Sequence, residues 1–253
     1  MQTGLVLMSH EFYPARHRQV SDLAVDPGDS RDAEREIAHA RQAYKRLSVR
    51  QRIGLRFREK LYSEMIYNNV VRKRKPAKII TLVREPIGNN ISMFFQTFDE
   101  YVDSGRGLAD YEIDELVAVF LDRYVHSRPL IWLDAELRTT LGIDVYAAPF
   151  PIERGHVTIR GGPFELLVLK CELSDSEKES AIAGFVGIDD LKLIRSNVTK
   201  NKDHGRQYEE FRRRIKLPDS YLDYVYGSKY ARFFYSDAER AKFRAHWSRR
   251  DGS

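Results

Sequence analysis

The 253-residue chain has one cysteine, Cys171, and no long apolar run. A single thiol excludes an intramolecular disulfide and a zinc site built from thiolates. No run approaches the roughly 20 apolar residues that span a bilayer, and residues 1–10 lack a basic leader and a long apolar segment. The histidines show no spacing typical of metal ligands. We therefore expect a cytoplasmic protein without a transmembrane segment or a metal site.

The sequence also lacks low-complexity tracts, internal repeats and linkers. Hydrophobic residues make up 42% and aromatic residues 11%, which excludes a disordered chain. The net charge of +5 and the pI near 9.2 favour anionic partners such as nucleotides, acidic polysaccharides or nucleic acid. No nucleic-acid-binding motif is present, so no nucleic-acid partner is predicted. We expect one α/β domain over residues 1–253, with a helical, basic C-terminal part from about residue 203.

The apolar periodicity predicts strands separated by helices. Short apolar runs fit strands at residues 5–8, 78–83, 143–146, 157–159 and 166–169, the last two joined around Gly161 and Gly162. Helical periodicity and capping signals predict helices near residues 30–47, 48–71, 87–102, 111–127, 129–141, 174–187 and 203–217, and a last helix from 236. This alternation favours a parallel sheet flanked by helices, in which ligands bind beyond the carboxyl ends of the strands.

A fixed cation, Arg84, stands where the predicted strand 78–83 gives way to a helix that begins at Pro86. The free N–H groups at the start of a helix also attract anions, so a phosphate at this junction would be bound twice. Ser92 lies about 9 Å along the helix axis from Pro86, and its hydroxyl could donate to the same phosphate. The alternative is that Arg84 pairs with Glu85 or another acid and that Ser92 is merely a small residue.

The segment from Val83 to Phe95 carries a resemblance to a known site. It contains Val83-Arg84-Glu85-Pro86, Asn89-Asn90-Ile91-Ser92 and Phe94-Phe95. These residues resemble the 3′-phosphate-binding segment of sulfotransferases that use 3′-phosphoadenosine 5′-phosphosulfate. In that superfamily an arginine at the end of a strand is followed eight residues later by a helical serine, as Arg84 is by Ser92. The resemblance implies a sulfotransferase-like P-loop fold and assigns both residues to the 3′-phosphate.

Further blocks of sequence carry a closer resemblance. They are Gly142 to Tyr146, Pro149-Phe150, Glu165 to Leu169, Glu172, Phe185 to Gly187, Asn197, Lys202, Tyr208, Phe211, Leu217-Pro218, Tyr226, Ser228 to Tyr230, Phe234 to Ser236, and Trp247. In these blocks the chain is similar to capsular polysaccharide synthesis proteins of bacteria, a branch of sulfotransferase-like proteins. The similarity is specific for the family and not for a substrate.

The chain departs from the sulfotransferase pattern at its front. Sulfotransferases begin with a strand and a phosphate-cradling loop for the 5′-phosphosulfate, and nothing of that kind precedes Leu5. The fold is therefore expected to miss its first strand, loop and helix, which would leave apolar surface and favour homo-oligomers. His10 ends the first predicted strand, where the resemblance implies a base that deprotonates an acceptor hydroxyl; Glu11 is the alternative base.

Two functional hypotheses follow from the resemblance. The first is a sulfotransferase that transfers sulfate from 3′-phosphoadenosine 5′-phosphosulfate to a carbohydrate hydroxyl, with little activity in the chain as written because the loop is missing. The second is a non-catalytic protein of polysaccharide assembly that uses the fold to bind nucleotide or polysaccharide. The implied partners are a nucleotide sulfuryl donor and a carbohydrate acceptor, and the sequence does not identify the acceptor.

Overall fold

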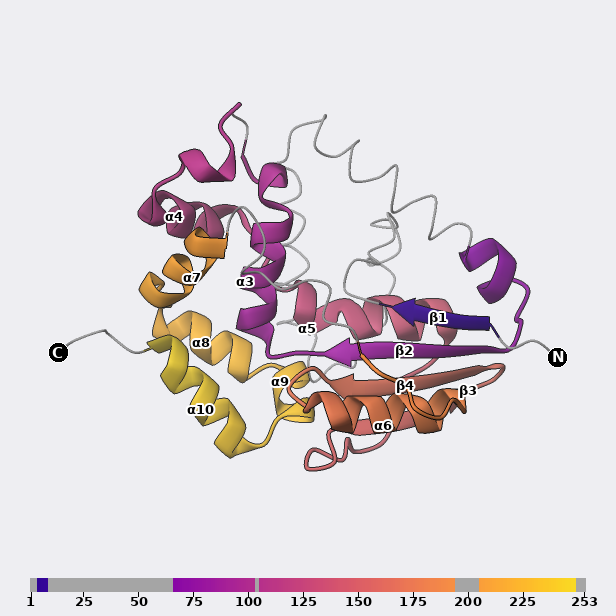
Figure 1. The fold of residues 1–253 in the computed structure, drawn as a ribbon. Helices are drawn as coiled ribbons and strands as arrows, with labels where there is room; N and C mark the ends of the chain where they lie inside the picture. The colour runs from indigo at the N-terminus through magenta and orange to yellow at the C-terminus, as the bar shows by residue number, and fades with distance from the viewer. Residues whose placement is uncertain (1–3, 9–65, 103–104, 194–204, 249–253) are drawn as a thin grey trace.

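The computed structural model describes residues 4–8, 66–102, 105–193 and 205–248. Within these ranges, four strands form one sheet in the order β1-β2-β4-β3 (Figure 1). The parallel strands are β1 (Gly4–Met8), β2 (Ala77–Val83) and β4 (Phe164–Lys170), whereas β3 (His156–Gly161) is antiparallel to β4. The predicted strands 5–8, 78–83, 157–159 and 166–169 are therefore confirmed, and the prediction of a parallel sheet was wrong at the β3 edge.

The cause of the antiparallel edge is a two-residue connection. Gly161 pairs with Phe164, so only Gly162 and Pro163 join β3 to β4. Gly162 has a φ of 58°, a left-handed conformation that glycine adopts without strain. A connection this short can join only antiparallel strands, because parallel strands need a crossover of a dozen or more residues.

Helical segments make up most of the remaining described structure. They are η2 (Tyr67–Val71), α3 (Pro86–Gln96), η3 (Phe98–Glu100), η4 (Leu108–Asp110), α4 (Ile113–Arg123), α5 (Arg128–Trp132), η5 (Leu133–Leu141), α6 (Asp175–Val186), α7 (Gly205–Arg214), α8 (Asp219–Tyr226), α9 (Lys229–Phe234) and α10 (Asp237–Ser248). None of these helices is both long and apolar enough to cross a bilayer.

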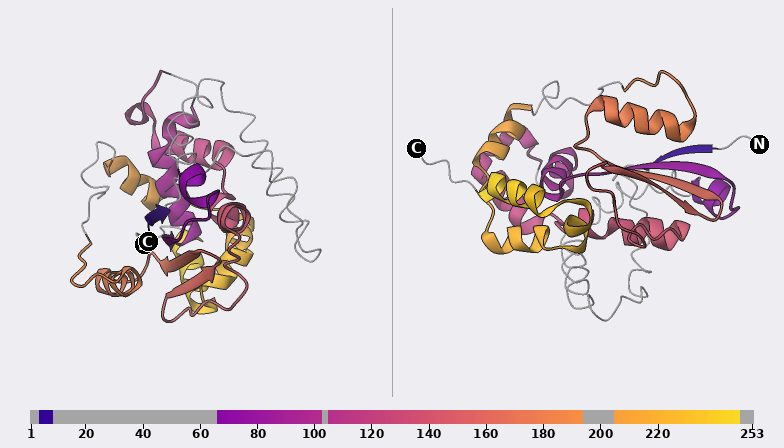
Figure 2. Two further views of the ribbon diagram at one scale, coloured as in Figure 1. Left: turned by 90° about the vertical axis from the view of Figure 1, so that its right-hand side faces the viewer. Right: turned by 90° about the horizontal axis from the view of Figure 1, so that it is seen from below.

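The sheet has helices on both faces. Ile79, Val83, Leu166 and Val168 share one buried cluster with side chains of α5, η5 and α9. On the opposite face, Ile80, Leu167 and Leu169 pack against α6. Figure 2 shows α6 on one side of the sheet and the α5–η5 segment on the other. This burial of both faces explains why β2 and β4 are almost continuously apolar.

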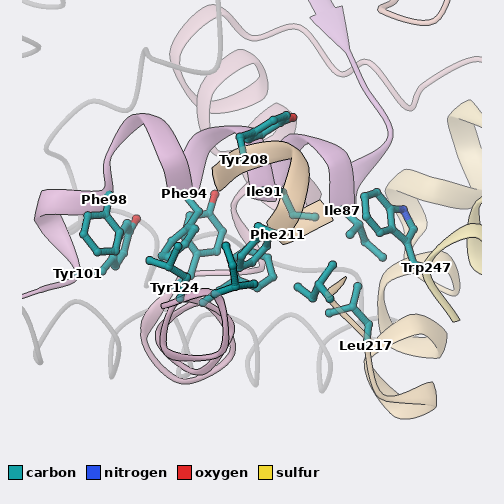
Figure 3. Packing of buried hydrophobic residues seen from close by; sticks show 14 of the residues in the cluster. Ile87, Ile91, Phe94, Phe98, Tyr101, Tyr124, Tyr208, Phe211, Leu217 and Trp247 are labelled. Atoms are coloured by element: carbon teal, nitrogen blue, oxygen red, sulfur yellow. The ribbon is translucent and has the colours of Figure 1, made fainter. Parts of the chain in front are cut away.

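A second core lies at the carboxyl end of β2, where α3, α4, α7, α8 and α10 gather (Figure 1). Figure 3 shows Phe94 of α3 among aromatic side chains from other segments of this cluster. Phe94, Phe120 and Phe211 are fully buried, and their ring centroids lie 5.3–5.9 Å apart. This aromatic cluster fixes α3, which begins at the end of β2, against the C-terminal half of the protein.

Two sequence predictions about local structure were wrong. Residues 143–146 do not form a strand, although Ile143 and Val145 are buried in the core beside η5. Their alternating apolar pattern therefore serves packing in an irregular segment. The helix expected over 87–102 ends at Gln96 and is followed by the short helix η3. The expected helix ends at Gly142 and Gly187 are confirmed, each glycine having a positive φ.

Candidate functional site at the β2–α3 junction

The β2–α3 junction consists of Arg84 and Glu85, which connect the end of β2 to Pro86, the first residue of α3. The buried phenol of Tyr230 holds the backbone of Arg84. Its oxygen accepts a hydrogen bond from the Arg84 N–H at 3.0 Å and donates one to the Arg84 carbonyl at 3.1 Å. Tyr230 is fully buried and lies on α9. The C-terminal helices therefore fix the position from which the Arg84 side chain extends.

The Glu85 carboxylate occupies the first turn of α3. It accepts hydrogen bonds from the N–H groups of Ile87 at 2.9 Å and Gly88 at 2.6 Å. The phenol of Tyr226 donates a third hydrogen bond to it at 2.7 Å. Burial raises the pKa of the Glu85 carboxyl above its usual value, although these three donors act in the opposite direction. The sequence predicts that free N–H groups at the start of this helix bind a phosphate. In the structure, the N–H groups of Ile87 and Gly88 donate to the Glu85 side chain instead.

A second carboxylate ties the end of β4 to the junction. Glu172 follows β4, and its Oε1 accepts a hydrogen bond from the Glu85 N–H at 2.7 Å. Its Oε2 accepts one from the phenol of Tyr235 at 3.2 Å. Beside it, the buried Lys170 ammonium lies 2.5 Å from the Glu239 carboxylate. These contacts join the carboxyl ends of β2 and β4 to the segment that runs from α8 to α10.

The Arg84 guanidinium lies over the first turn of α3. Its Nη2 is 3.9 Å from the position that a Cβ atom on Gly88 would take. That position is also 2.9 Å from Oε2 of Glu85, so a side chain at residue 88 would displace the Glu85 carboxylate. Within the described ranges, no carboxylate lies within salt-bridge distance of Arg84. Arg84 therefore does not form the ion pair with Glu85 that the sequence analysis gave as the alternative.

Ser92 lies on the same face of α3 as Gly88, one helical turn further along. A spacing of four residues corresponds to about 6 Å along the axis. The Ser92 hydroxyl is partly exposed and receives a weak hydrogen bond of 3.5 Å from Gln96 Nε2. The Arg84 guanidinium and the Ser92 hydroxyl therefore lie by the same face of α3, at successive turns.

Residues 110–236, just over half of the chain, match the model of the NKWYS family, which is described as "Putative capsular polysaccharide synthesis protein". The chain belongs to this family. No curated protein and no solved structure matches the chain. The NKWYS segment includes Glu172, Tyr226, Tyr230 and Tyr235, which hold the junction, and it begins after Arg84 and Ser92.

The NKWYS segment also contributes a buried polar cluster that holds the middle of α3. Asn90 is fully buried, and its Nδ2 donates to the carbonyl of His126 at 3.0 Å. The His126 ring contacts the carbonyl of Phe120 at 2.9 Å through Nε2 and the phenol of Tyr221 at 2.9 Å through Nδ1. A carbonyl can only accept, so Nε2 donates to the Phe120 carbonyl, and in the neutral ring Nδ1 accepts from the Tyr221 phenol. This cluster orients α3 and does not reach the Arg84 side chain.

The remaining predicted site residues, His10 and Glu11, lie outside the described residues. In the described part of the NKWYS protein, no group of three or more His, Cys, Asp or Glu side chains is arranged to hold a metal ion. The sequence predicted neither the contact of the Glu85 carboxylate with the first turn of α3 nor the contact of the Tyr230 phenol with Arg84. A signal existed for Glu85 alone, because an acidic residue directly before Pro86 occupies the N-cap position of the predicted helix.

Proposed function

We propose that this NKWYS-family protein is a sulfotransferase-like protein of bacterial capsular polysaccharide synthesis. It binds 3′-phosphoadenosine 5′-phosphosulfate at the β2–α3 junction and transfers sulfate to a carbohydrate hydroxyl. The observation that carries this proposal is the position of Arg84. Its guanidinium lies at the carboxyl end of a parallel strand, where ligands bind in such sheets, and over the first turn of α3.

Arg84 suits a phosphate because its planar guanidinium can form two parallel hydrogen bonds with phosphate oxygens. Its backbone is pinned by Tyr230, so little conformational freedom of the main chain is lost on binding. The Ser92 hydroxyl can donate a further hydrogen bond from the next turn of α3. Together these two residues form the proposed 3′-phosphate site.

The Glu85 carboxylate changes how this phosphate is bound. Because the N–H groups of Ile87 and Gly88 already donate to Glu85, they are not available to the ligand. Among the described residues, Arg84 is then the main source of positive charge in the proposed site. The loss of Arg84 should therefore weaken phosphate binding more than it would in a site that also used free helix N–H groups.

The proposed chemistry is an in-line displacement at sulfur. A base, His10 or in its place Glu11, removes the proton from the acceptor hydroxyl, whose oxygen then bonds to sulfur. The bond between sulfur and the oxygen of the 5′-phosphate breaks, and adenosine 3′,5′-bisphosphate leaves. Arg84 and Ser92 contribute by holding the nucleotide, so that the reacting atoms are correctly oriented.

The second candidate function is a non-catalytic nucleotide- or polysaccharide-binding protein of capsule assembly. One observation favours it: the helix N-terminus at the junction is occupied by the carboxylate of Glu85. A protein that only binds nucleotide would need Arg84 and Ser92 and would not need a base.

Sulfate transfer tests the first function against the second. We expect the wild type to transfer labelled sulfate from 3′-phosphoadenosine 5′-phosphosulfate to mixed bacterial capsule saccharides only slowly, because the chain as written lacks the phosphosulfate loop. Arg84→Ala should lower kcat/KM about 10- to 100-fold, because hydrogen bonds to charged groups contribute about 1.5–3 kcal/mol. The control is Arg206→Ala, which removes an exposed cation from α7. Equal kcat/KM for wild type and Arg84→Ala would contradict the assignment of Arg84, whereas nucleotide binding without transfer would support the second function.

A further inference from the structure

A groove of about 920 Å³ lies between α6 and the hairpin of β3 and β4. Its end at Lys78 lies far from the β2–α3 junction, whereas its other end, at His156, lies in the register of Leu169 of β4 and Leu82 of β2. Its lining includes Lys78, the second residue of β2, whereas Arg84 follows the last residue of that strand. Six residues of extended strand separate the two by about 20 Å. Figure 1 shows α6 lying along β3 and β4, away from the start of α3.

The floor of the groove is a row of alternating charges on the sheet. Lys78 on β2, Glu165 on β4 and Arg160 on β3 are direct neighbours in the strand register. The Arg160 guanidinium lies 3.1 Å from the Glu165 carboxylate. The Lys78 ammonium donates a hydrogen bond of 2.6 Å to the carbonyl of Phe185 on α6. Donors and acceptors of hydrogen bonds therefore alternate across the floor.

The wall of the groove is the face of α6 that carries Ser176, Ser180 and Gly184. These residues recur every four positions and so form one line along the helix. A Cβ atom at Gly184 would meet no other atom within 4 Å, so open space begins at the helix backbone there. Small and hydroxyl-bearing side chains thus leave room for a ligand beside the charged floor.

The charges of the lining balance among the described residues. Three cations, Lys78, Arg154 and Arg160, face three carboxylates, Glu153, Glu165 and Glu177. Burial and the nearby Arg154 lower the pKa of His156, which also lines the groove and is therefore neutral at pH 7. A net charge of zero does not select an anion such as a nucleotide. It suits a ligand whose groups both donate and accept hydrogen bonds.

We propose that this groove binds a saccharide chain. Each sugar hydroxyl can donate to a carboxylate and accept from an arginine or lysine, which matches the alternating floor. The ring C–H faces can contact Ala181 and Phe185, partly exposed apolar residues of the lining. The volume lies at the upper end of the range of about 300–1,000 Å³ for ligand pockets, so it accommodates more than one sugar ring. The proposal does not rest on Arg84 or on sulfate transfer.

The test is binding of the intact protein to an array of neutral and acidic capsular oligosaccharides, followed by titration of the best ligand. We expect Gly184→Trp, which fills the groove, to abolish binding. Ala118→Trp places the same side chain on an exposed position of α4 and should bind as the wild type does. Arg160→Ala should weaken binding about tenfold. Since the Arg160 side chain is 82% exposed, Arg160→Ala should fold normally.

Three results would overturn the proposal. These are binding of no arrayed saccharide by the wild type, equal binding by Gly184→Trp and Ala118→Trp, or binding of acidic saccharides alone that Arg160→Ala leaves unchanged. The last result would show that acidic saccharides bind through the net positive charge of the protein and not in the groove. Affinity for adenosine 3′,5′-bisphosphate, measured on the same variants, should not change. Failure of the groove and failure of the nucleotide site are therefore read from separate measurements.

Discussion

Replacing Phe94 by alanine is expected to lower the free energy of unfolding by about 3–5 kcal/mol, the usual cost of deleting a fully buried phenylalanine side chain. The Phe94 side chain has no exposed surface. Its ring centroid lies 5.3–6.0 Å from those of the surrounding aromatic residues, which are Phe95, Phe98, Tyr101, Phe120, Tyr124 and Phe211. Urea denaturation followed by circular dichroism measures the loss.

The control for this variant is Phe95→Ala, which removes the neighbouring, partly exposed ring of the same helix. Phe95→Ala should lower the free energy of unfolding less than Phe94→Ala does, because folding buries less apolar surface of the Phe95 ring. A loss below about 1 kcal/mol for Phe94→Ala would show that α3 is not held by the aromatic cluster. The position of Arg84 over α3 would then need another explanation.

The second large effect concerns Glu136, whose carboxyl is buried in η5. Burial raises the pKa of this carboxyl from 4.5 to about 8, and no partner within the described ranges offsets it. The folded protein thus keeps the proton up to about pH 8, whereas the unfolded chain loses it near pH 4.5. Between these values the unfolded chain binds fewer protons, so stability falls as pH rises, by up to about 1.4 kcal/mol per pH unit.

Glu136→Gln removes this titration while keeping the size of the side chain. We expect the unfolding free energy of the variant to exceed that of the wild type by several kcal/mol at pH 8.5 and to match it near pH 4.5. Denaturation curves at intervals of one pH unit measure the difference, and Glu112→Gln, an exposed residue before α4, is the control. A difference independent of pH would mean that folding does not raise the pKa of the Glu136 carboxyl.

The sequence predicted the elements around the junction because the signals there are local. The apolar run before Val83 and proline at the first helical position define the strand, the turn and the start of α3. The capping boxes at Ser174 and Ser236 are likewise formed in the structure. These features are determined by residues close together in the sequence, so they could be predicted without knowledge of the tertiary structure.

The contacts that complete the candidate site are not local, and the sequence did not reveal them. Tyr230 lies 146 residues from Arg84, and Tyr226 lies 141 residues from Glu85. Nothing in the spacing of these tyrosines indicates a partner at the end of β2. The sequence also failed to predict that β3 runs antiparallel to β4. The alternation of strands and helices favoured a parallel sheet, and the two-residue turn at Gly162 decided otherwise.

The central claim is that Arg84 binds the 3′-phosphate of an adenosine nucleotide, and calorimetry tests it most directly. The quantity to measure is the affinity for adenosine 3′,5′-bisphosphate relative to adenosine 5′-monophosphate, which lacks the 3′-phosphate. We expect this ratio to be about 10 or more in the wild type and in Arg206→Ala, lower in Ser92→Ala, and close to 1 in Arg84→Ala. A ratio near 1 in the wild type, or an unchanged ratio in Arg84→Ala, would contradict the claim.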